Sequence, residues 1–369
     1  MTIPLVDLAS QHAEIADEIR PALERVFATT AFVGGPEVAA FEREYAEYVG
    51  VAHCVGVANG TDAIELALRA VGVGPGDEVL LPANTFIATA EAVSHVGATP
   101  VLVDVDEEHL LIDPARVEGA ITDRTKAILP VHLFGQTAFV EELQRLADAA
   151  GVVLIEDAAQ AQGARRWGRP AGSLGRLAAT SFYPGKNLGA AGDAGAVTTD
   201  DPELAERVRI TAAHGSPSKY VHDVVGRNSR LDAVQAVYLR AKLARLEKWN
   251  QLRREAATRY DELLAPFDGI RRPRPAAGNE DVWHLYVVRV DERDRVLDTL
   301  AADGIGVGIH YPTPVHLTRA YSHLGLGPGS FPVAEAAARR ILSLPMFPHL
   351  SMDQQERVAD ALARAVAVA

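Results

Sequence analysis

Short apolar runs alternate with longer amphipathic segments between Val51 and about Ala213. The apolar runs are typical of buried strands, and we expect strands at residues 53–58, 78–81, 100–104, 127–131 and 152–155. The segments between them have helical spacing, most clearly at 62–71, 88–96 and 140–150. This alternation predicts an α/β fold with a mainly parallel sheet and helices on both of its faces.

The pattern changes after about Ser216. Apolar positions with helical spacing predict long helical segments over residues 231–264, which could bridge two domains. Residues 271–275 are typical of an irregular connector. Beyond them we expect a smaller α+β unit, with strands at 284–290 and 305–310 and helices at 293–302, 332–342 and 353–368. The chain is therefore predicted to divide into a large domain, 1–240, and a smaller C-terminal domain, 241–369.

Composition narrows the classes of function. Of 369 residues, 48% are hydrophobic and 23% are charged, which is typical of a folded globular protein. The net charge of −13 disfavours nonspecific binding to nucleic acid or to an anionic membrane, because both are polyanions. The single cysteine, Cys54, excludes an intrachain disulfide and a cysteine-rich zinc site.

The first residues, MTIPLVDLASQH, lack the basic and apolar stretches of a signal peptide. No window approaches the length of uncharged apolar sequence that a membrane span needs. We therefore expect a cytoplasmic protein. Lysines are few, so any that carries chemistry can be sought among Lys126, Lys186, Lys219, Lys242 and Lys248.

A first candidate site is Asn59-Gly60-Thr61-Asp62, between a predicted strand and a predicted helix. Gly60 permits a tight turn, and Thr61 or Asp62 can cap the helix. The free N–H groups and positive dipole end of a helix N-terminus suit a phosphate. The alternative is an ordinary capped turn.

A second candidate is the segment Ile155-Glu156-Asp157-Ala158-Ala159-Gln160, in which a predicted strand runs directly into two acids. At least one carboxylate should lie at the end of the strand, where open α/β sheets bind ligands. A buried carboxylate is costly unless a cation or a proton pairs with it. The alternative is a helix cap formed by Asp157.

A third candidate is Lys186, within Ser181-Phe182-Tyr183-Pro184-Gly185-Lys186-Asn187-Leu188-Gly189. Glycine and proline hold this lysine on a rigid loop between two predicted strands. A lysine in a partly dry site has a lowered pKa and can form a Schiff base with an aldehyde. The alternative is a solvated surface charge.

One cofactor, pyridoxal phosphate, would account for all three candidates. Its aldehyde needs a lysine, its phosphate suits a helix N-terminus, and its ring nitrogen needs a carboxylate. The order along the chain, phosphate loop, then acid, then lysine, strengthens this interpretation.

These motifs resemble the sugar aminotransferases of the DegT/DnrJ/EryC1/StrS family, which have the aspartate aminotransferase (fold type I) architecture. The resemblance extends over nearly the whole chain. It rests on ANGTDAIELAL at Ala58, LPANTFIATA at Leu81, IEDAAQAQGA at Ile155, SFYPGKNLGAAGDAGAV at Ser181, GRNSRLDAVQA at Gly226 and IHYPTPVHL at Ile309.

The resemblance implies a role for each matching residue. Lys186 would bind the cofactor aldehyde and move protons, Asp157 would pair with the ring nitrogen, and Gln160 would contact the ring hydroxyl. Phe86 would stack on the ring, although without the resemblance it reads as a core aromatic. The phosphate would be held by Gly60, Thr61, Ser181 and, from the partner subunit of a homodimer, Asn228.

Other matching residues are expected to face the substrate: Tyr183, Lys219, Arg230, His310 and Tyr311. For Lys219 and Arg230, an ion pair at the surface or at an interface is the alternative. The implied reaction transfers an amino group from L-glutamate to a nucleotide-linked ketosugar, and the motifs are most similar to those of enzymes that act on dTDP-3-keto-6-deoxyhexoses for antibiotic or surface-glycan sugars.

Four alternatives to this interpretation stay open at the level of sequence. Relatives with similar motifs act on UDP-linked 3-keto uronic acids, and others aminate the fourth carbon of the sugar. Dehydratases of the same fold carry histidine in place of the lysine, so Lys186 favours transamination. A catalytically silent binding protein is disfavoured because the set of Lys186, Asp157, Gln160 and Ser181 is intact.

Overall fold

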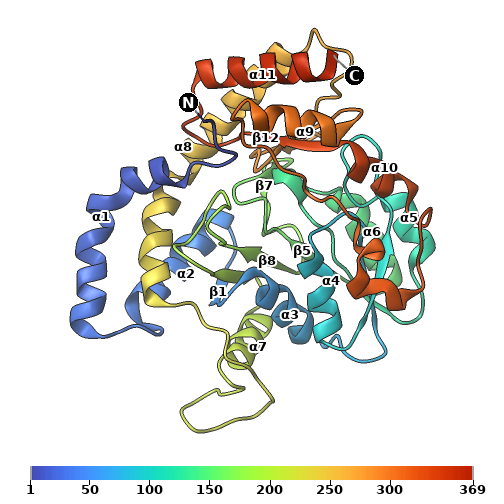
Figure 1. The fold of residues 1–369 in the computed structure, drawn as a ribbon. Helices are drawn as coiled ribbons and strands as arrows, with labels where there is room; N and C mark the ends of the chain where they lie inside the picture. The colour runs from blue at the N-terminus through green and yellow to red at the C-terminus, as the bar shows by residue number, and fades with distance from the viewer. Residues whose placement is uncertain (1, 368–369) are drawn as a thin grey trace.

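A seven-stranded mixed sheet forms the centre of the computed structural model, which describes residues 2–367 (Figure 1). Its strand order is β1-β9-β8-β5-β4-β2-β3. All strands run parallel except β9, which is antiparallel to both of its neighbours. The strands are β1 (His53–Val57), β2 (Glu78–Pro82), β3 (Thr99–Val103), β4 (Thr125–Ile128), β5 (Val153–Asp157), β8 (Leu177–Ser181) and β9 (Gly195–Thr199). The predicted, mainly parallel sheet is confirmed.

Both faces of the sheet are covered because its strands are apolar on both sides. Along β2, Val79 and Leu81 belong to one core cluster and Leu80 to another, as the alternation of side chains in a strand requires. On the first face pack α3 (Gly60–Ala70), α4 (Ile87–His95) and α7 (Pro202–Ala212). On the other pack α2 (Gly35–Val49), α5 (Pro114–Ala120) and α6 (Val140–Ala150).

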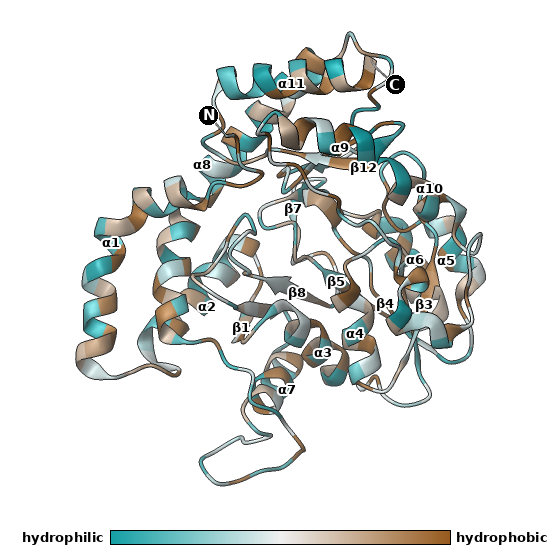
Figure 2. Ribbon diagram, viewed as in Figure 1, coloured by the Kyte–Doolittle hydropathy of each residue, from teal (hydrophilic) through white to brown (hydrophobic). Residues whose placement is uncertain are grey.

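The C-terminal part forms a second, smaller core. Strands β11 (Tyr286–Arg289) and β12 (Ile341–Leu344) pair antiparallel, and α9 (Arg293–Ala302) and α11 (Met352–Ala367) pack beside them. In Figure 2 these helices carry teal and brown side by side, as amphipathic helices do. The predicted strand at 305–310 is wrong: only single bridges form, from Ile305 to Ile3 and from Gly308 to Ser343. The last predicted helix extends to residue 368, which lies outside the described residues.

One long helix, α8 (Ala233–Leu264), connects the two cores. Its first half packs with α1 (Leu8–Thr29) and α2, and Tyr260 and Leu264 in its second half belong to the C-terminal core. The domain boundary predicted between residues 240 and 241 falls inside this helix, and the division stays a prediction.

Smaller elements complete the described chain, among them α10 (Pro332–Arg340), which is followed at once by β12. The predicted helix at 332–342 therefore ends two residues early, because Ile341 and Leu342 pair with β11 instead. The remaining elements are the short strands β6 (Arg165–Arg166), β7 (Arg169–Pro170) and β10 (Asn279–Glu280) and the 3₁₀ turns η1 (Leu133–Gly135), η2 (Val315–Leu317) and η3 (Arg319–Leu324).

Candidate active site

A cavity of about 830 Å³ lies at the carboxyl ends of the parallel strands. β1 leads into it through Asn59, β2 through Thr85, β5 through Asp157 and β8 through Ser181. The cavity contains ten of the thirteen residues predicted for the site: Gly60, Thr61, Phe86, Asp157, Gln160, Ser181, Tyr183, Lys186, His310 and Tyr311. Parallel strands end at the same edge of a sheet, so segments distant in sequence meet there.

The N-terminus of α3 opens into this cavity. Asn59 caps the helix by accepting a hydrogen bond from the Asp62 N–H at 2.8 Å, so the cap is neither Thr61 nor Asp62 as the sequence suggested. A Cβ on Gly60 would lie 2.5 Å from that of Ser181, so only glycine fits against β8 here. The first N–H groups of a helix have no intrahelical partner. The turn therefore offers N–H donors to an anion beside the Ser181 hydroxyl.

The Asp157 carboxylate is buried at the end of β5. It accepts hydrogen bonds from the Thr89 hydroxyl at 2.8 Å and from the Ala159 N–H at 3.1 Å. Burial raises the pKa of Asp157, an effect that these hydrogen bonds and the charge of Lys186 oppose only in part. No helix begins after β5, so Asp157 is not the helix cap of the alternative, although it does bond a nearby N–H group. The carboxylate also lacks a full cationic partner. A protonated ring nitrogen would supply one.

Lys186 lies on the tight loop between β8 and β9. Its own N–H donates to the Tyr183 carbonyl at 2.8 Å, and a Cβ on Gly189 would lie 2.2 Å from the Pro184 carbonyl oxygen. The amine is not a solvated surface charge: burial lowers the pKa of Lys186 to about 8, against the opposing charge of Asp157. Near neutral pH the unprotonated, nucleophilic share of such an amine is far larger than that of a lysine with an ordinary pKa, although the protonated form still predominates.

Aromatic and amide groups also line the cavity. Phe86 is 52% exposed and lies 5.3 Å, centroid to centroid, from the ring of Tyr311, so it is not a core residue. Gln160 accepts from the Phe134 N–H at 2.7 Å and donates to the Tyr311 hydroxyl at 3.0 Å. His310 lies beside Tyr311, with its Nδ1 2.8 Å from the Ser343 hydroxyl, and burial lowers the pKa of His310 to about 4.

Three predicted residues do not line the cavity: Lys219, Asn228 and Arg230. All three are exposed on the segment between α7 and α8, which projects from the body of the molecule as a long loop (Figure 1). Lys219 lies over the ring of Tyr220 at 5.0 Å. Within residues 2–367 neither Lys219 nor Arg230 forms an ion pair, so a surface ion pair within this chain does not explain them.

Two features of the cavity were missed from sequence. Thr85 and Thr89 are joined hydroxyl to hydroxyl at 2.7 Å, and this pair orients Asp157. Thr85 precedes α4, which begins at Ile87, so helical spacing does not describe this pair and no sequence pattern indicated it. His284 also lines the cavity, and its sequence context, inside a predicted strand, carried no signal.

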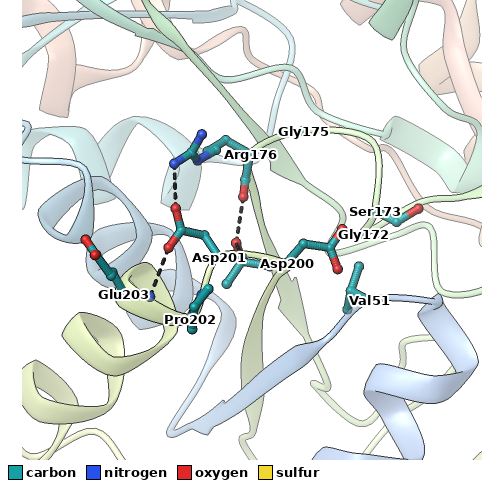
Figure 3. A pocket seen from close by; sticks show the side chains of 10 residues that line it. Val51, Gly172, Ser173, Gly175, Arg176, Asp200, Asp201, Pro202 and Glu203 are labelled. Atoms are coloured by element: carbon teal, nitrogen blue, oxygen red, sulfur yellow. Dashed lines mark hydrogen bonds and ion pairs between the residues drawn. The ribbon is translucent and has the colours of Figure 1, made fainter.

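A second cavity, of about 690 Å³, lies near the start of α7 (Figure 3). Asp201 pairs with Arg176 and accepts from the N–H groups of Glu203 and Leu204, as an N-cap does. Asp200 accepts from the Ala52 N–H at 2.8 Å. The charged groups of this second cavity thus cap α7 and bond nearby backbone. The catalytic candidates therefore remain in the first cavity.

Two other kinds of feature are absent from residues 2–367. No helix there is long and apolar enough to cross a membrane. No group of three or more His, Cys, Asp or Glu side chains there could hold a metal ion.

Comparison with known proteins gives matches over almost the whole chain. The sequence profile of the DegT/DnrJ/EryC1/StrS aminotransferase family matches residues 13–363. The erythromycin biosynthesis sensory transduction protein EryC1 of Saccharopolyspora erythraea is 50% identical over 97% of this chain and 98% of its own. The dTDP-3-amino-3,4,6-trideoxy-alpha-D-glucose transaminase of Streptomyces venezuelae is 49% identical over 98% of this chain and 95% of its own. The UDP-N-acetyl-3-dehydro-alpha-D-glucosamine 3-aminotransferase of Acidithiobacillus ferrooxidans is 47% identical over 98% of this chain and 97% of its own.

Solved structures match equally well. DesV of S. venezuelae, determined in complex with a ketimine intermediate, superposes with a TM-score of 0.96 at 49% identity and covers 98% of both chains. NtdA of Bacillus subtilis, determined with the bound cofactor PMP, has a TM-score of 0.89 at 32% identity and covers 96% of this chain and 82% of its own. The fold is therefore that of the pyridoxal phosphate aminotransferases.

Replacing Lys186 by alanine should abolish turnover and remove the covalent link to pyridoxal phosphate, because among residues 2–367 no other lysine lines the cavity. Borohydride reduction followed by mass spectrometry of the peptides measures the link. Lys126→Ala, at an exposed position on β4, is the matched control. Near-normal activity of Lys186→Ala would contradict the assignment.

The rate at which the cofactor-free chain captures pyridoxal phosphate should rise between about pH 7 and about pH 9 and then level, because the pKa of Lys186 is lowered to about 8. Below this pKa the amine is protonated and cannot attack the aldehyde; above it the amine is free. Stopped-flow absorbance measures the rate. A rate that keeps rising through about pH 10 would show a lysine with an ordinary pKa.

Proposed function

The chain belongs to the DegT/DnrJ/EryC1/StrS aminotransferase family, and we propose that it transfers an amino group from L-glutamate to a dTDP-linked 3-keto-6-deoxyhexose. It is a pyridoxal phosphate-dependent aminotransferase of fold type I. The amino donor, the position of amination and the sugar go beyond this family assignment and are the proposal.

One observation carries the proposal: the Lys186 amine shares a cavity with a buried carboxylate and a helix N-terminus. These groups fit the three ends of pyridoxal phosphate. The N–H groups at Gly60 and Thr61 would hold the phosphate, Asp157 would hold the ring nitrogen, and Lys186 would hold the aldehyde. The clearest sign that this cofactor fits is the buried Asp157 carboxylate, which lacks a full cationic partner that a protonated ring nitrogen would provide.

When bound, the cofactor supplies an aldehyde for amines and a protonated ring that accepts an electron pair. Asp157 keeps the proton on the ring nitrogen, and Thr89 orients the carboxylate for this task. The Lys186 amine would take the proton from the α-carbon of glutamate at Nζ. Its lowered pKa makes it a base near neutral pH, and a placed base typically contributes about 10²–10⁴-fold in rate.

The relatives support a nucleotide-linked ketosugar as the acceptor. The S. venezuelae relative is named for a dTDP-3-amino sugar, and the same position of the amine recurs in the UDP sugar of the A. ferrooxidans relative. Tyr183, His310 and Tyr311 line the cavity and would face the sugar. The UDP-linked sugar is the second candidate, because the two relatives differ in identity by only two percentage points. The EryC1 relative, which is named for erythromycin biosynthesis, supports an antibiotic pathway as the setting.

A homodimer with shared active sites would complete the cavity. The segment that carries Lys219, Asn228 and Arg230 also exposes apolar side chains, with Tyr220 84% and Val225 97% exposed. Such exposure on a projecting loop is typical of a surface that a partner covers. A second copy of the chain would bring Asn228 to the phosphate and Lys219 and Arg230 to the substrate.

The purified protein should show a visible absorption band that L-glutamate bleaches, and a dTDP-3-keto-6-deoxyhexose should then restore the band. Spectra recorded after each addition test cofactor, donor and acceptor in turn. Restoration by a UDP-linked 3-keto sugar alone would select the second candidate. A band that glutamate leaves unchanged would reject this donor.

Coexpression of Lys186→Ala and Asn228→Ala chains should recover activity that neither variant has alone. If Asn228 serves the partner's site, each mixed dimer contains one site with both Lys186 and Asn228 intact. Tandem affinity tags isolate the mixed dimer, and steady-state assays measure its rate. The absence of recovery would place Asn228 outside the partner's site.

A further inference from the structure

The proposed reaction gives no role to the connector Arg271-Arg272-Pro273-Arg274-Pro275. This connector borders a cavity of about 380 Å³, which falls within the range of about 300–1,000 Å³ typical of small-molecule sites. Among residues 2–367, the cavity shares no lining residue with the active-site cavity. Four arginines line it, and we call it the basic cavity: Arg271, Arg272, Arg274 and Arg289.

The backbone holds Arg271 and Arg289 directly opposite each other. The Arg271 N–H donates to the Arg289 carbonyl at 3.0 Å, and the Arg289 N–H donates to the Arg271 carbonyl at 2.9 Å. Residues opposed in this way carry their side chains on the same face, and both line the basic cavity. Like charges in such a pair destabilise the structure, so the fold keeps together two groups that repel each other.

The Arg289 guanidinium is buried without a carboxylate of its own. It is 7% exposed, and it donates through Nη1 to the Glu107 carbonyl and through Nη2 to the Glu108 carbonyl, the latter at 2.8 Å. Burial and the charge of Arg271 lower the pKa of Arg289 to about 10, which the charge of Glu107 opposes only in part. The positive charge is therefore stabilised less than it would be in water, and an anion in the cavity would correct this.

Arg272 and Arg274 extend the basic surface along the connector. Arg272 Nη1 donates to the Asp261 carbonyl at 2.6 Å, which fixes this side chain. Arg274 is exposed, and within the described part of the chain it forms neither a hydrogen bond nor an ion pair. Pro273 and Pro275 restrict the backbone on both sides of it. A stiff backbone lowers the entropy that a ligand must overcome when it orders the site.

Nearby carboxylates do not balance these positive charges. Among residues 2–367, Glu108 and Asp268 are the carboxylates that line the basic cavity beside the four arginines. The Glu107 carboxylate pairs with Arg271 at 2.9 Å but is itself exposed, and exposed ion pairs are weak. The Asp261 carboxylate accepts from the Tyr286 hydroxyl at 2.6 Å. A local excess of positive charge thus persists on a chain whose net charge is −13.

We propose that the basic cavity binds an anion that carries a diphosphate group. A guanidinium presents forked N–H donors that match phosphate oxygens, and neighbouring guanidiniums can share the oxygens of one diphosphate. The charge of the anion would offset the repulsion between Arg271 and Arg289. Inorganic pyrophosphate and a nucleoside diphosphate both offer this chemistry. Phe267 also lines the cavity and is 38% exposed, so its ring is available to the base of a nucleotide.

Isothermal titration calorimetry of the holoenzyme with inorganic pyrophosphate tests the site. We expect Arg274→Glu to weaken binding about tenfold, because a charge-assisted hydrogen bond is lost and a repulsive charge is added. Arg274→Lys keeps the charge without the fork and should lose less. Arg145→Glu, at an exposed position on α6, makes the same change in net charge and should bind as the wild type does.

Thermal unfolding without the anion checks that each variant is folded. If Arg274→Glu is not, Arg274→Gln takes its place, since it removes the charge without reversing it. No binding of pyrophosphate by the wild type would overturn the proposal. The same affinity in the wild type and in the Arg274 variant would also overturn it, because the binding would then belong to another site, such as the active site.

A parallel titration with dTDP distinguishes the two sources of the diphosphate. Tighter binding of dTDP than of pyrophosphate, with the difference lost in Phe267→Ala, would support a nucleotide as the ligand. Equal affinities that Phe267→Ala leaves unchanged would support inorganic pyrophosphate. Neither titration depends on turnover, so a holoenzyme that fails to transfer an amino group would reject the proposed reaction and leave this test valid.

Discussion

Burial acts on two opposite charges within one cavity, and the site depends on the balance between them. It raises the pKa of Asp157 and lowers the pKa of Lys186, so each group is pushed toward its neutral form. Their mutual attraction opposes both effects only in part. A ligand that brings a cation to the carboxylate and an aldehyde to the amine relieves both costs, which is why this arrangement suits pyridoxal phosphate.

The sheet makes this balance possible because its parallel strands end at one edge. β5 ends at Asp157 and β8 at Ser181, and these adjacent strands bring the acid close to the loop that carries the lysine. Glu156, one residue earlier, points to the opposite face, where its carboxylate accepts from His132 and from three backbone N–H groups. Adjacent acids in one strand therefore have different environments: Glu156 holds loops behind the sheet, and Asp157 faces the cavity.

Close approaches of backbone limit the residues that the site accepts. Gly60 lies against Ser181, Gly189 against the Pro184 carbonyl and Gly163 against Asn250. A side chain at any of them would displace, respectively, the turn before α3, the loop of Lys186 or the amide of Asn250. The glycines of the motifs thus act through packing as much as through turn conformation.

Patterning along the chain was sufficient to predict the sheet, the helices on both of its faces and the order of phosphate turn, acid and lysine. These features depend on local periodicity and on turn residues, which act over a few positions. The roles of Gln160, Phe86 and His310 came from the resemblance to a family, because a lone aromatic or amide reads equally well as core.

Only the tertiary structure decided which groups meet. It placed Thr89 on Asp157, put Phe86 in the cavity rather than in the core, and left Asn228 on a projecting loop outside it. It also joined Asn187 by hydrogen bonds to His284 and to Asn250, which lies 63 positions further along the chain. The physical reason is that hydrogen-bond partners and burial are properties of neighbours in space, and no local pattern in the sequence encodes them.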